Sequence, residues 1–205
     1  MNDFIVHWKN FIFSTGVIAI IYLIWDVIFT YLGIWGFNHD YCLGIYFFKL
    51  PLEEILFFFI IPFCSLFIHY AFNSVLPNLK ISVRNTHFLA YLIIVISSII
   101  VLIFYSKAYT LINAFFLIGV LLIGLKYHLE HLQKFFITFL IILIPFIIVN
   151  GILTGAITES PVVWYDNTEN LGFRIISIPI EDFAYAFSML FGNLMIFEYL
   201  NSKKN

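Results

Sequence analysis

Hydrophobic residues gather in six long stretches along the 205-residue chain, separated by short segments rich in polar residues, Pro and Gly. Each stretch holds about 20 residues, the length that an α-helix needs to cross a hydrocarbon core of roughly 30 Å. The pattern predicts six transmembrane helices, at about residues 11–34, 51–72, 88–105, 109–125, 135–152 and 178–200.

Composition supports this assignment. Hydrophobic residues make up 62% of the chain, charged residues 11%, and the mean hydropathy is +1.01. These values lie far outside the range of soluble domains, so we expect an all-α, polytopic transmembrane helix bundle. The net charge of −2 and the lack of a basic run give no indication of a nucleic-acid partner.

Basic residues are unevenly divided between the two sides that six crossings define. Seven would share a side with the termini and three would lie opposite. By the positive-inside rule, both termini are expected to be cytoplasmic, in a bacterial cell membrane. The terminal set is Lys9, Lys80, Arg84, Lys126, Lys134, Lys203 and Lys204; the opposite set is Lys49, Lys107 and Arg174.

The chain contains an internal repeat. Residues 44–54 read Gly-Ile-Tyr-Phe-Phe-Lys-Leu-Pro-Leu-Glu-Glu, and residues 172–182 read Gly-Phe-Arg-Ile-Ile-Ser-Ile-Pro-Ile-Glu-Asp. Further upstream, Asn150 stands where the first half has Asp26. Four predicted crossings separate the two copies, so both motifs would lie on one membrane face. We divide the chain into two parallel repeats, 1–105 and 106–205.

Each copy places two carboxyl groups directly after a proline: Glu53 and Glu54, then Glu181 and Asp182. Carboxylates in the first turn of a helix can simply stabilise its dipole, by about 0.3 to 1 kcal/mol. Their duplication and the position of Asp26 inside the first helix favour a functional site. Because helical neighbours point ~100° apart, one carboxyl of each pair is expected to face the interior.

Such a site suits acid catalysis on an apolar substrate. A buried carboxyl group disfavours its charged form, and neighbouring carboxyls share a proton, so a carboxylic acid can stay protonated near neutral pH. A cation formed from an alkene could be stabilised by the faces of the 26 Phe, 12 Tyr and 4 Trp. Cys42 and Cys64 lack a CxxC or His partner at ligand spacing, so we interpret them as packing residues and predict no metal site.

Several strings resemble the heterodimeric, non-flavin carotenoid cyclases, best known as lycopene beta-cyclases, with both halves fused in one chain. They are Trp-Asp at 25–26, Gly-Ile-Trp-Gly-Phe-Asn at 33–38, Leu-Pro-Leu-Glu-Glu at 50–54, Asn-Gly-Ile-Leu-Thr-Gly at 150–155, Pro-Val-Val-Trp-Tyr at 161–165 and Ile-Pro-Ile-Glu-Asp at 178–182. The resemblance covers about residues 25–70 and 150–199. Family members commonly begin with a further apolar helix, so the first half is expected to be shorter.

The resemblance implies acid-catalysed cyclisation of the psi ends of lycopene, a non-redox reaction of the isomerase or intramolecular lyase class. It implies no cofactor, in keeping with the lack of a GxGxxG string. Expected partners are lycopene or a related linear carotenoid, membrane lipid, and a second copy of the chain or other carotenoid enzymes. The implied catalytic residues are Glu53, Glu54, Glu181 and Asp182, supported by Asp26, Asn38, Asn150, Trp164 and Arg174.

Some alternatives stay open at this stage. Acid and base are not distinguished, nor are beta and epsilon rings, one or two cyclised ends, or C40 and C50 substrates. A proton-coupled transporter would also use internal repeats and intramembrane carboxylates. Such transporters typically have a helix broken by Gly or Pro at the same place in both halves, whereas Pro62 and Pro145 do not correspond in the alignment of the halves. A prenyltransferase is a second alternative, but the chain lacks the Asp-rich motifs with which such enzymes bind magnesium and diphosphate. A non-catalytic membrane scaffold is the third alternative.

Overall fold

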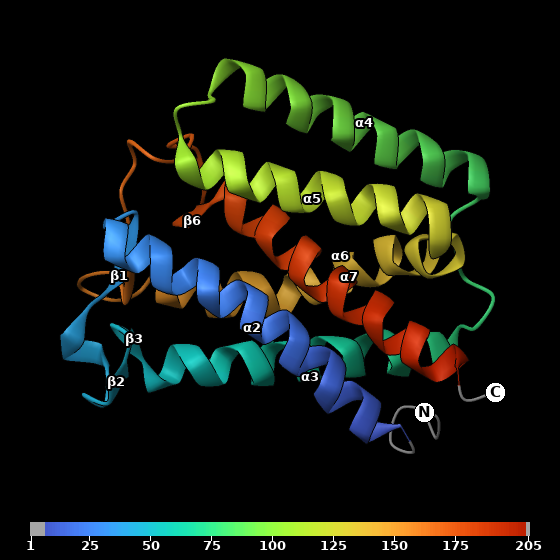
Figure 1. Ribbon diagram of the computed structural model, residues 1–205, viewed down its shortest axis with the longest axis horizontal. Coiled ribbons are helices and arrows are strands. Elements are labelled where there is room, and N and C mark those ends of the chain that lie inside the picture. Colours follow the sequence, from blue (N-terminus) through green and yellow to red (C-terminus); the bar gives the residue numbers. More distant parts are fainter. Residues whose placement is uncertain (1–6, 204–205) are drawn as a thin grey trace.

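The computed structural model describes residues 7–203, and within them six helices account for most of the chain (Figure 1). All six are long and apolar enough to cross a membrane. The predicted all-α bundle of a multi-pass membrane protein is therefore confirmed. The helices are α2 (Trp8–Leu32), α3 (Leu52–Val75), α4 (Val83–Ile103), α5 (Ala108–Tyr127), α6 (Leu129–Leu153) and α7 (Ile180–Ser202).

Two helices begin five or six residues earlier than predicted. Helix α4 starts at Val83 instead of residue 88, and α6 starts at Leu129 instead of residue 135. The first turns of these helices carry polar residues, so they lie outside the apolar stretches from which the helices were predicted. Polar residues at this place fit a helix that extends beyond the hydrocarbon core. The Ser82 hydroxyl caps α4 by accepting a hydrogen bond from the Asn85 amide at 3.3 Å.

The helices alternate in direction, so their connections lie on two sides. We call the side with residues 33–51, 104–107 and 154–179 the motif side, and the side with residues 76–82, residue 128, the start of α2 and the end of α7 the terminal side (Figure 1). Both repeated motifs fall on the motif side. Of the seven basic residues predicted to share a side with the termini, Lys204 lies outside the described residues, and the other six lie on the terminal side.

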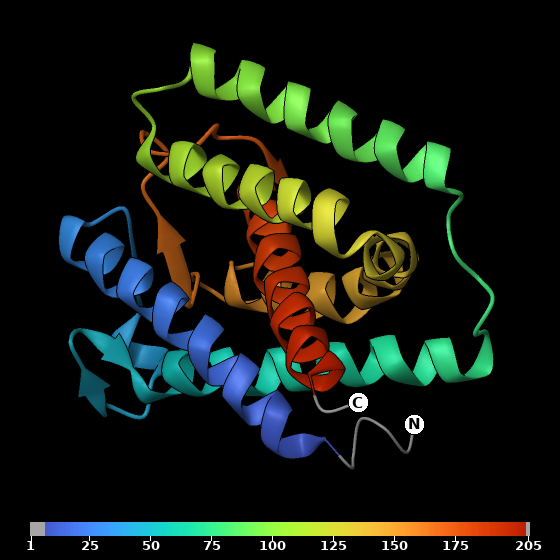
Figure 2. The same cartoon turned by 45° about the vertical axis from the view of Figure 1, so that its right-hand side comes forward.

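Helix α7 forms the centre of the bundle (Figure 2). It packs against α2, α3, α5 and α6, and 61% of its 18 most apolar consecutive residues are buried, against 17% for α4. Two glycines allow close packing against it. The Phe191 ring of α7 lies over Gly124 of α5, and Gly192 of α7 faces Ile18 of α2. Small residues at helix contacts are typical of membrane bundles.

Hydrogen bonds between buried side chains join α7 to α2. The Tyr22 hydroxyl donates to Ser188 Oγ at 2.8 Å, and Asn193 Nδ2 donates to Thr15 Oγ1 at 2.9 Å. Such bonds contribute about 0.6 kcal/mol each in a membrane protein. They fix the register of the first helix against the last.

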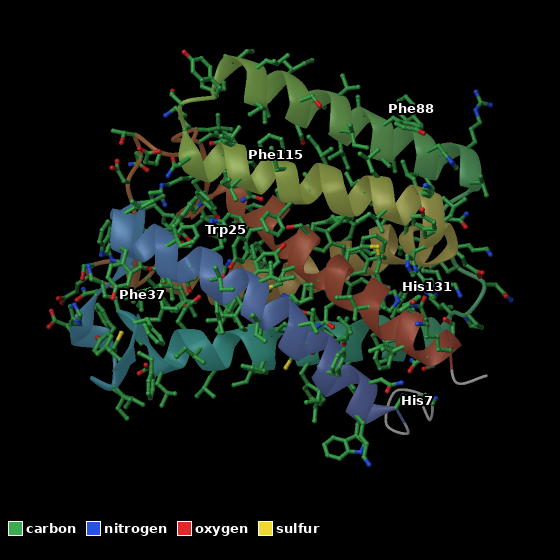
Figure 3. All side chains as sticks on the ribbon, in the orientation of Figure 1. His7, Trp25, Phe37, Phe88, Phe115 and His131 are labelled. Atoms are coloured by element: carbon green, nitrogen blue, oxygen red, sulfur yellow. The ribbon has the colours of Figure 1, made fainter. Side chains whose placement is uncertain are left out.

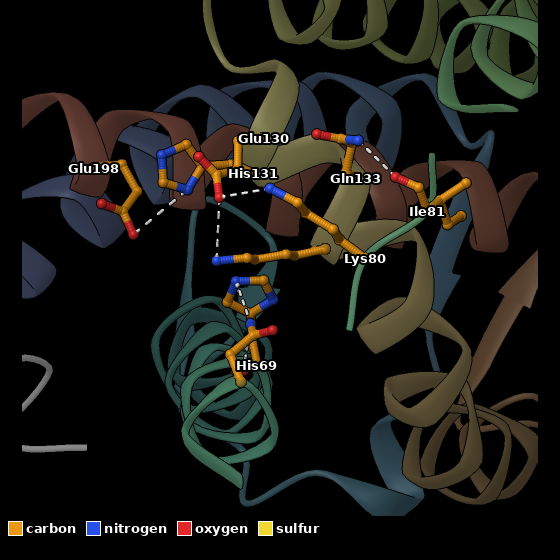
Figure 4. Close-up of polar contacts among 9 residues, drawn as sticks. His69, Lys80, Ile81, Glu130, His131, Gln133 and Glu198 are labelled. Atoms are coloured by element: carbon orange, nitrogen blue, oxygen red, sulfur yellow. Dashed lines mark hydrogen bonds and ion pairs between the residues drawn. The ribbon is translucent and has the colours of Figure 1, made fainter. Parts of the chain in front are cut away.

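Polar contacts also link the helices near the terminal side (Figure 4). His69 of α3 is 3% exposed and bonds Thr138 of α6 at 2.7 Å. Gln133 of α6 donates to the Ile81 carbonyl at 2.6 Å, and Lys80 pairs with Glu130 at 3.1 Å. The terminal-side halves of α3 and α6 are therefore held together.

The outer surface is apolar, as expected for lipid contact. Phe88 of α4 and Phe115 of α5, marked in Figure 3, are 65% and 58% exposed, whereas Trp25 is buried inside the bundle. A soluble protein rarely exposes so many large hydrophobic side chains.

We predict that Gly124→Ala destabilises the bundle by about 1–3 kcal/mol, because the added Cβ would lie 2.6 Å from Cε1 of the Phe191 ring, in a fully buried contact. Gly119→Ala in the same helix is the matched control. Its Cβ meets nothing within 4 Å, and it should stabilise the helix by up to about 1 kcal/mol. Thermal unfolding in detergent measures both variants, and equal midpoints would contradict the close packing of α5 and α7.

Candidate active site

Each repeated motif folds into a two-stranded hairpin that leads directly into a helix. Strands β2 (Tyr46–Phe47) and β3 (Leu50–Pro51) precede α3, and strands β5 (Arg174–Ile175) and β6 (Ile178–Pro179) precede α7. The registers correspond, since Tyr46 pairs with Pro51 and Arg174 pairs with Pro179. Both prolines are the N-cap residues of their helices, so each carboxyl pair stands in the first turn.

The first carboxylate of each pair binds the loop before its own hairpin. Glu53 Oε1 accepts a hydrogen bond from the Leu43 amide at 2.6 Å, and Glu181 Oε1 accepts one from the Leu171 amide at 2.8 Å. The donor lies ten residues before the carboxylate in both halves. Glu181 also accepts from the Thr110 hydroxyl at 2.7 Å. These two carboxylates therefore anchor the hairpins.

The second carboxyl group of each pair lines an interior cavity of about 150 Å³. Glu54 of α3 and Asp182 of α7 meet there with Asp26 of α2, and Glu54 is near enough to the other two for their charges to interact. Asn150 of α6 lines the same cavity. The structure thus brings together four of the nine predicted site residues, from four different helices.

Two tyrosines hold Asp182. The Tyr109 hydroxyl of α5 donates to Oδ1 at 2.5 Å, and the Tyr165 hydroxyl donates to Oδ2 at 3.0 Å. Burial, together with the adjacent Asp182 carboxylate, raises the pKa of Tyr165 well above its ordinary value. This phenol therefore stays protonated and remains a donor, and two such donors stabilise an ionised Asp182.

The other two carboxyl groups have different surroundings. Asp26 is 2% exposed, and its Oδ1 accepts from the Trp35 indole N–H at 2.6 Å and from Thr30 at 3.4 Å. Its Oδ2 has no partner among residues 7–203. Within the same range, Glu54 has no hydrogen-bond partner and faces the cavity. A carboxyl group in such a place is more stable with its proton.

Aromatic rings form much of the cavity wall. No Lys, Arg or His is found among the described residues that line it, and Arg174, whose charge interacts with Asp182, lies outside the wall. An ionised carboxylate in this setting is costly, which limits how many of the three carboxyl groups can be charged at once. The aromatic residues of the wall are Trp35, Phe37, Phe57, Tyr109, Phe146, Tyr165 and Tyr185.

Two of the predicted strings pair with each other at the motif-side end of the cavity. Strands β1 (Trp35–Phe37) and β4 (Val163–Tyr165) are antiparallel, with Gly36 opposite Trp164. Side chains alternate along a strand. The flanking residues of both strands line the cavity, whereas Trp164 is 41% exposed and its ring covers Gly36. This pair closes the motif-side end of the cavity.

Three predicted supporting residues lie outside the cavity wall. Asn38 donates to Ser160 Oγ at 2.9 Å and so joins the loops around the two strands. Arg174 donates to the Ser177 carbonyl at 2.6 Å, and its guanidinium carbon lies 5.6 Å from the centre of the Tyr165 ring. With Trp164, these residues hold the cover of the cavity and the tyrosine beside Asp182.

Sequence reasoning missed the residues that contact the carboxyl groups. Trp35 and Tyr165 belong to the strings at 33–38 and 161–165 that resemble the cyclase family, and this membership is the only indication in the sequence that they belong to the site. Tyr109 had no signal, because it begins a helix with no motif. It is placed by the segment 166–170, where the Glu169 carbonyl accepts from the Tyr109 amide at 3.0 Å and Lys107 Nζ donates to the Asn170 carbonyl at 2.6 Å.

A bundle of membrane helices that encloses acidic groups within an aromatic, apolar cavity defines an intramembrane site for an apolar ligand. Comparison with known families makes this specific. The family model for lycopene cyclase matches residues 3–72 and 106–200, well over half of the chain. The chain therefore belongs to the lycopene cyclase family. It is a carotenoid cyclase, with a carotenoid substrate. No curated protein and no solved structure matches the chain.

We predict that Gly36→Ala disrupts the cavity cover, because its Cβ would overlap the Trp164 ring. The expected loss is about 1–3 kcal/mol of stability, together with reduced cyclisation. The double variant Gly36→Ala/Trp164→Ala should recover most of the stability, since the overlapping ring is removed. Thermal unfolding of the three proteins tests the pairing, which would be wrong if the double variant were no more stable than Gly36→Ala.

Proposed function

We propose that the chain is a lycopene beta-cyclase, which converts the psi ends of lycopene to beta-ionone rings without net redox change. The observation that carries the proposal is the contrast between Glu54 and Asp182 in one apolar cavity. Glu54 lacks a hydrogen-bond donor among residues 7–203, and Asp182 accepts from two tyrosines. One carboxyl is suited to hold a proton and the other to hold a negative charge.

Glu54 is the proposed acid. Its proton adds to the terminal double bond of the substrate, which leaves a tertiary carbocation. The π electrons of the neighbouring alkene attack this cation and close a six-membered ring, so the positive charge moves to a ring carbon. No electrons are gained or lost in these steps.

The cation is stabilised by the ionised Asp182 and by aromatic faces of the cavity wall. A carboxylate then removes a proton from a ring carbon, and the electrons of that C–H bond form the ring double bond. Asp182 is the proposed base, and Asp26 supports the site. Loss of the proton from the carbon that joins ring and polyene gives the beta ring, and loss from the other neighbouring carbon gives the epsilon ring.

Glu53 and Glu181 are proposed to act through position. They fix the hairpins and thereby the direction of Glu54 and Asp182. Asn38, Trp164 and Arg174 are proposed to support the site from its cover, and Asn150 to contact the substrate within the cavity.

Conservative substitutions separate the two roles. In a lycopene-accumulating bacterium, wild type should form ringed products of the same mass as lycopene, and Glu54→Gln should lose at least about 10²-fold in activity because an amide cannot donate the proton. Glu53→Gln should keep most activity, since its amide oxygen can still accept from the Leu43 amide. Chromatography and mass spectrometry of the pigments measure both.

Immunoblots of membrane fractions control for the amount of each variant. Unchanged lycopene from inserted wild type would contradict the proposed function. Equal activity of Glu54→Gln and wild type would contradict the acid role alone.

We also propose that the terminal side faces the cytoplasm of a bacterial cell. Six of the nine described Lys and Arg residues lie on that side: Lys9, Lys80, Arg84, Lys126, Lys134 and Lys203. The bias in basic residues sets orientation in such proteins.

A reporter fusion tests this orientation. Green fluorescent protein after the last residue should fluoresce, because it folds in the cytoplasm, and alkaline phosphatase at the same place should be inactive. The same two reporters after Tyr105, on the motif side, should give the reverse. Active phosphatase at the C-terminus would contradict the orientation.

A further inference from the structure

The cavity opens sideways, between the middle of α3 and the motif-side half of α6. Three residues of its wall are exposed on the outside of the bundle: Cys64 of α3, and Pro145 and Val149 of α6. Surfaces at this depth face hydrocarbon in a chain with six apolar spans. The mouth of the cavity therefore faces lipid.

The cavity is too small for the whole substrate. Its volume of about 150 Å³ is that of a site that holds one six-membered ring. A linear carotenoid with the proposed psi end must leave the rest of its polyene elsewhere. The mouth between α3 and α6 is the exit that the wall provides.

A second hollow adjoins the cavity. It is an apolar groove along the terminal-side half of α3, and Ile68 lines both the groove and the cavity. Ala71 and Val75 of α3 and Ile141 of α6 belong to the groove. At a rise of about 1.5 Å per residue, Val75 lies about 32 Å along α3 from Glu54, so cavity and groove together extend across the membrane.

We propose that this groove binds the polyene of the substrate, which enters laterally from the bilayer and places one end group beside Glu54. The inference rests on the proposed function. One molecule then presents one end at a time, and the second ring requires release and return in the opposite orientation. A lipid acyl chain is the other candidate occupant of the groove. We favour the substrate because Ile68 lines both hollows, so the groove is aligned with a substrate whose end group lies in the cavity.

The test is a groove-filling variant assayed with two substrates. One is a linear C40 carotenoid with two psi ends, and the other is a truncated carotenoid with one psi end and about half the polyene. Ala71→Trp should reduce cyclisation of the long substrate by about tenfold or more, and change that of the short one by less than about twofold. Leu102→Trp, on the lipid-facing surface of α4 where Leu102 is 77% exposed, is the control and should alter neither.

Each outcome has a distinct meaning. Wild-type rates from Ala71→Trp on both substrates would overturn the groove and leave the proposed function standing. Wild-type membranes that cyclise neither substrate would contradict the proposed function and the groove with it. If Ala71→Trp lost both activities equally, Val75→Trp at the far end of the groove would decide, since selective loss of the long substrate supports the groove and unchanged activity overturns it.

Discussion

One hydrogen bond, made twice, sets the geometry of the two carboxyl pairs. Glu53 and Glu181 each accept the backbone N–H of the residue ten positions earlier, and so hold a hairpin against the first turn of a membrane helix. Because the next residue in a helix points ~100° away, anchoring one carboxylate directs its neighbour into the bundle. The directions in which Glu54 and Asp182 face the cavity depend on this arrangement.

The fold is largely readable from the sequence, because the bilayer imposes a length and an apolarity that leave a clear pattern. The hairpins of the motif side were not predicted, because the repeated spacing between glycine and proline marks a duplicated segment without specifying how its backbone pairs. The starts of α4 and α6 were not predicted either, since polar residues such as Arg84 and Glu130 continue a helix beyond the hydrocarbon without leaving an apolar signal. Only the packed structure shows where those helices begin.

The site is less predictable than the fold. The duplication indicated that one carboxyl of each pair faces the interior, and Glu54 and Asp182 do so together with Asp26. Their partners could not be found, because Tyr109 reaches Asp182 from a helix without a motif and through contacts with a distant loop. Spacing along the chain says little about residues that only tertiary packing brings together. The roles of all nine predicted site residues stay predictions.

Helix α4 shows what the arrangement of two halves requires. Among the described residues it contributes nothing to the cavity wall, it is among the least buried spans, and it falls in the segment 73–105 that the family model leaves out. Yet α3 ends on the terminal side and α5 begins on the motif side, so one crossing must lie between them. Without that crossing the second half would insert upside down, with Asp182 and Glu54 at opposite faces of the bilayer. Helix α4 thus provides the crossing that gives both halves the same orientation in the membrane. This role constrains its length and apolarity but not the identity of its individual side chains.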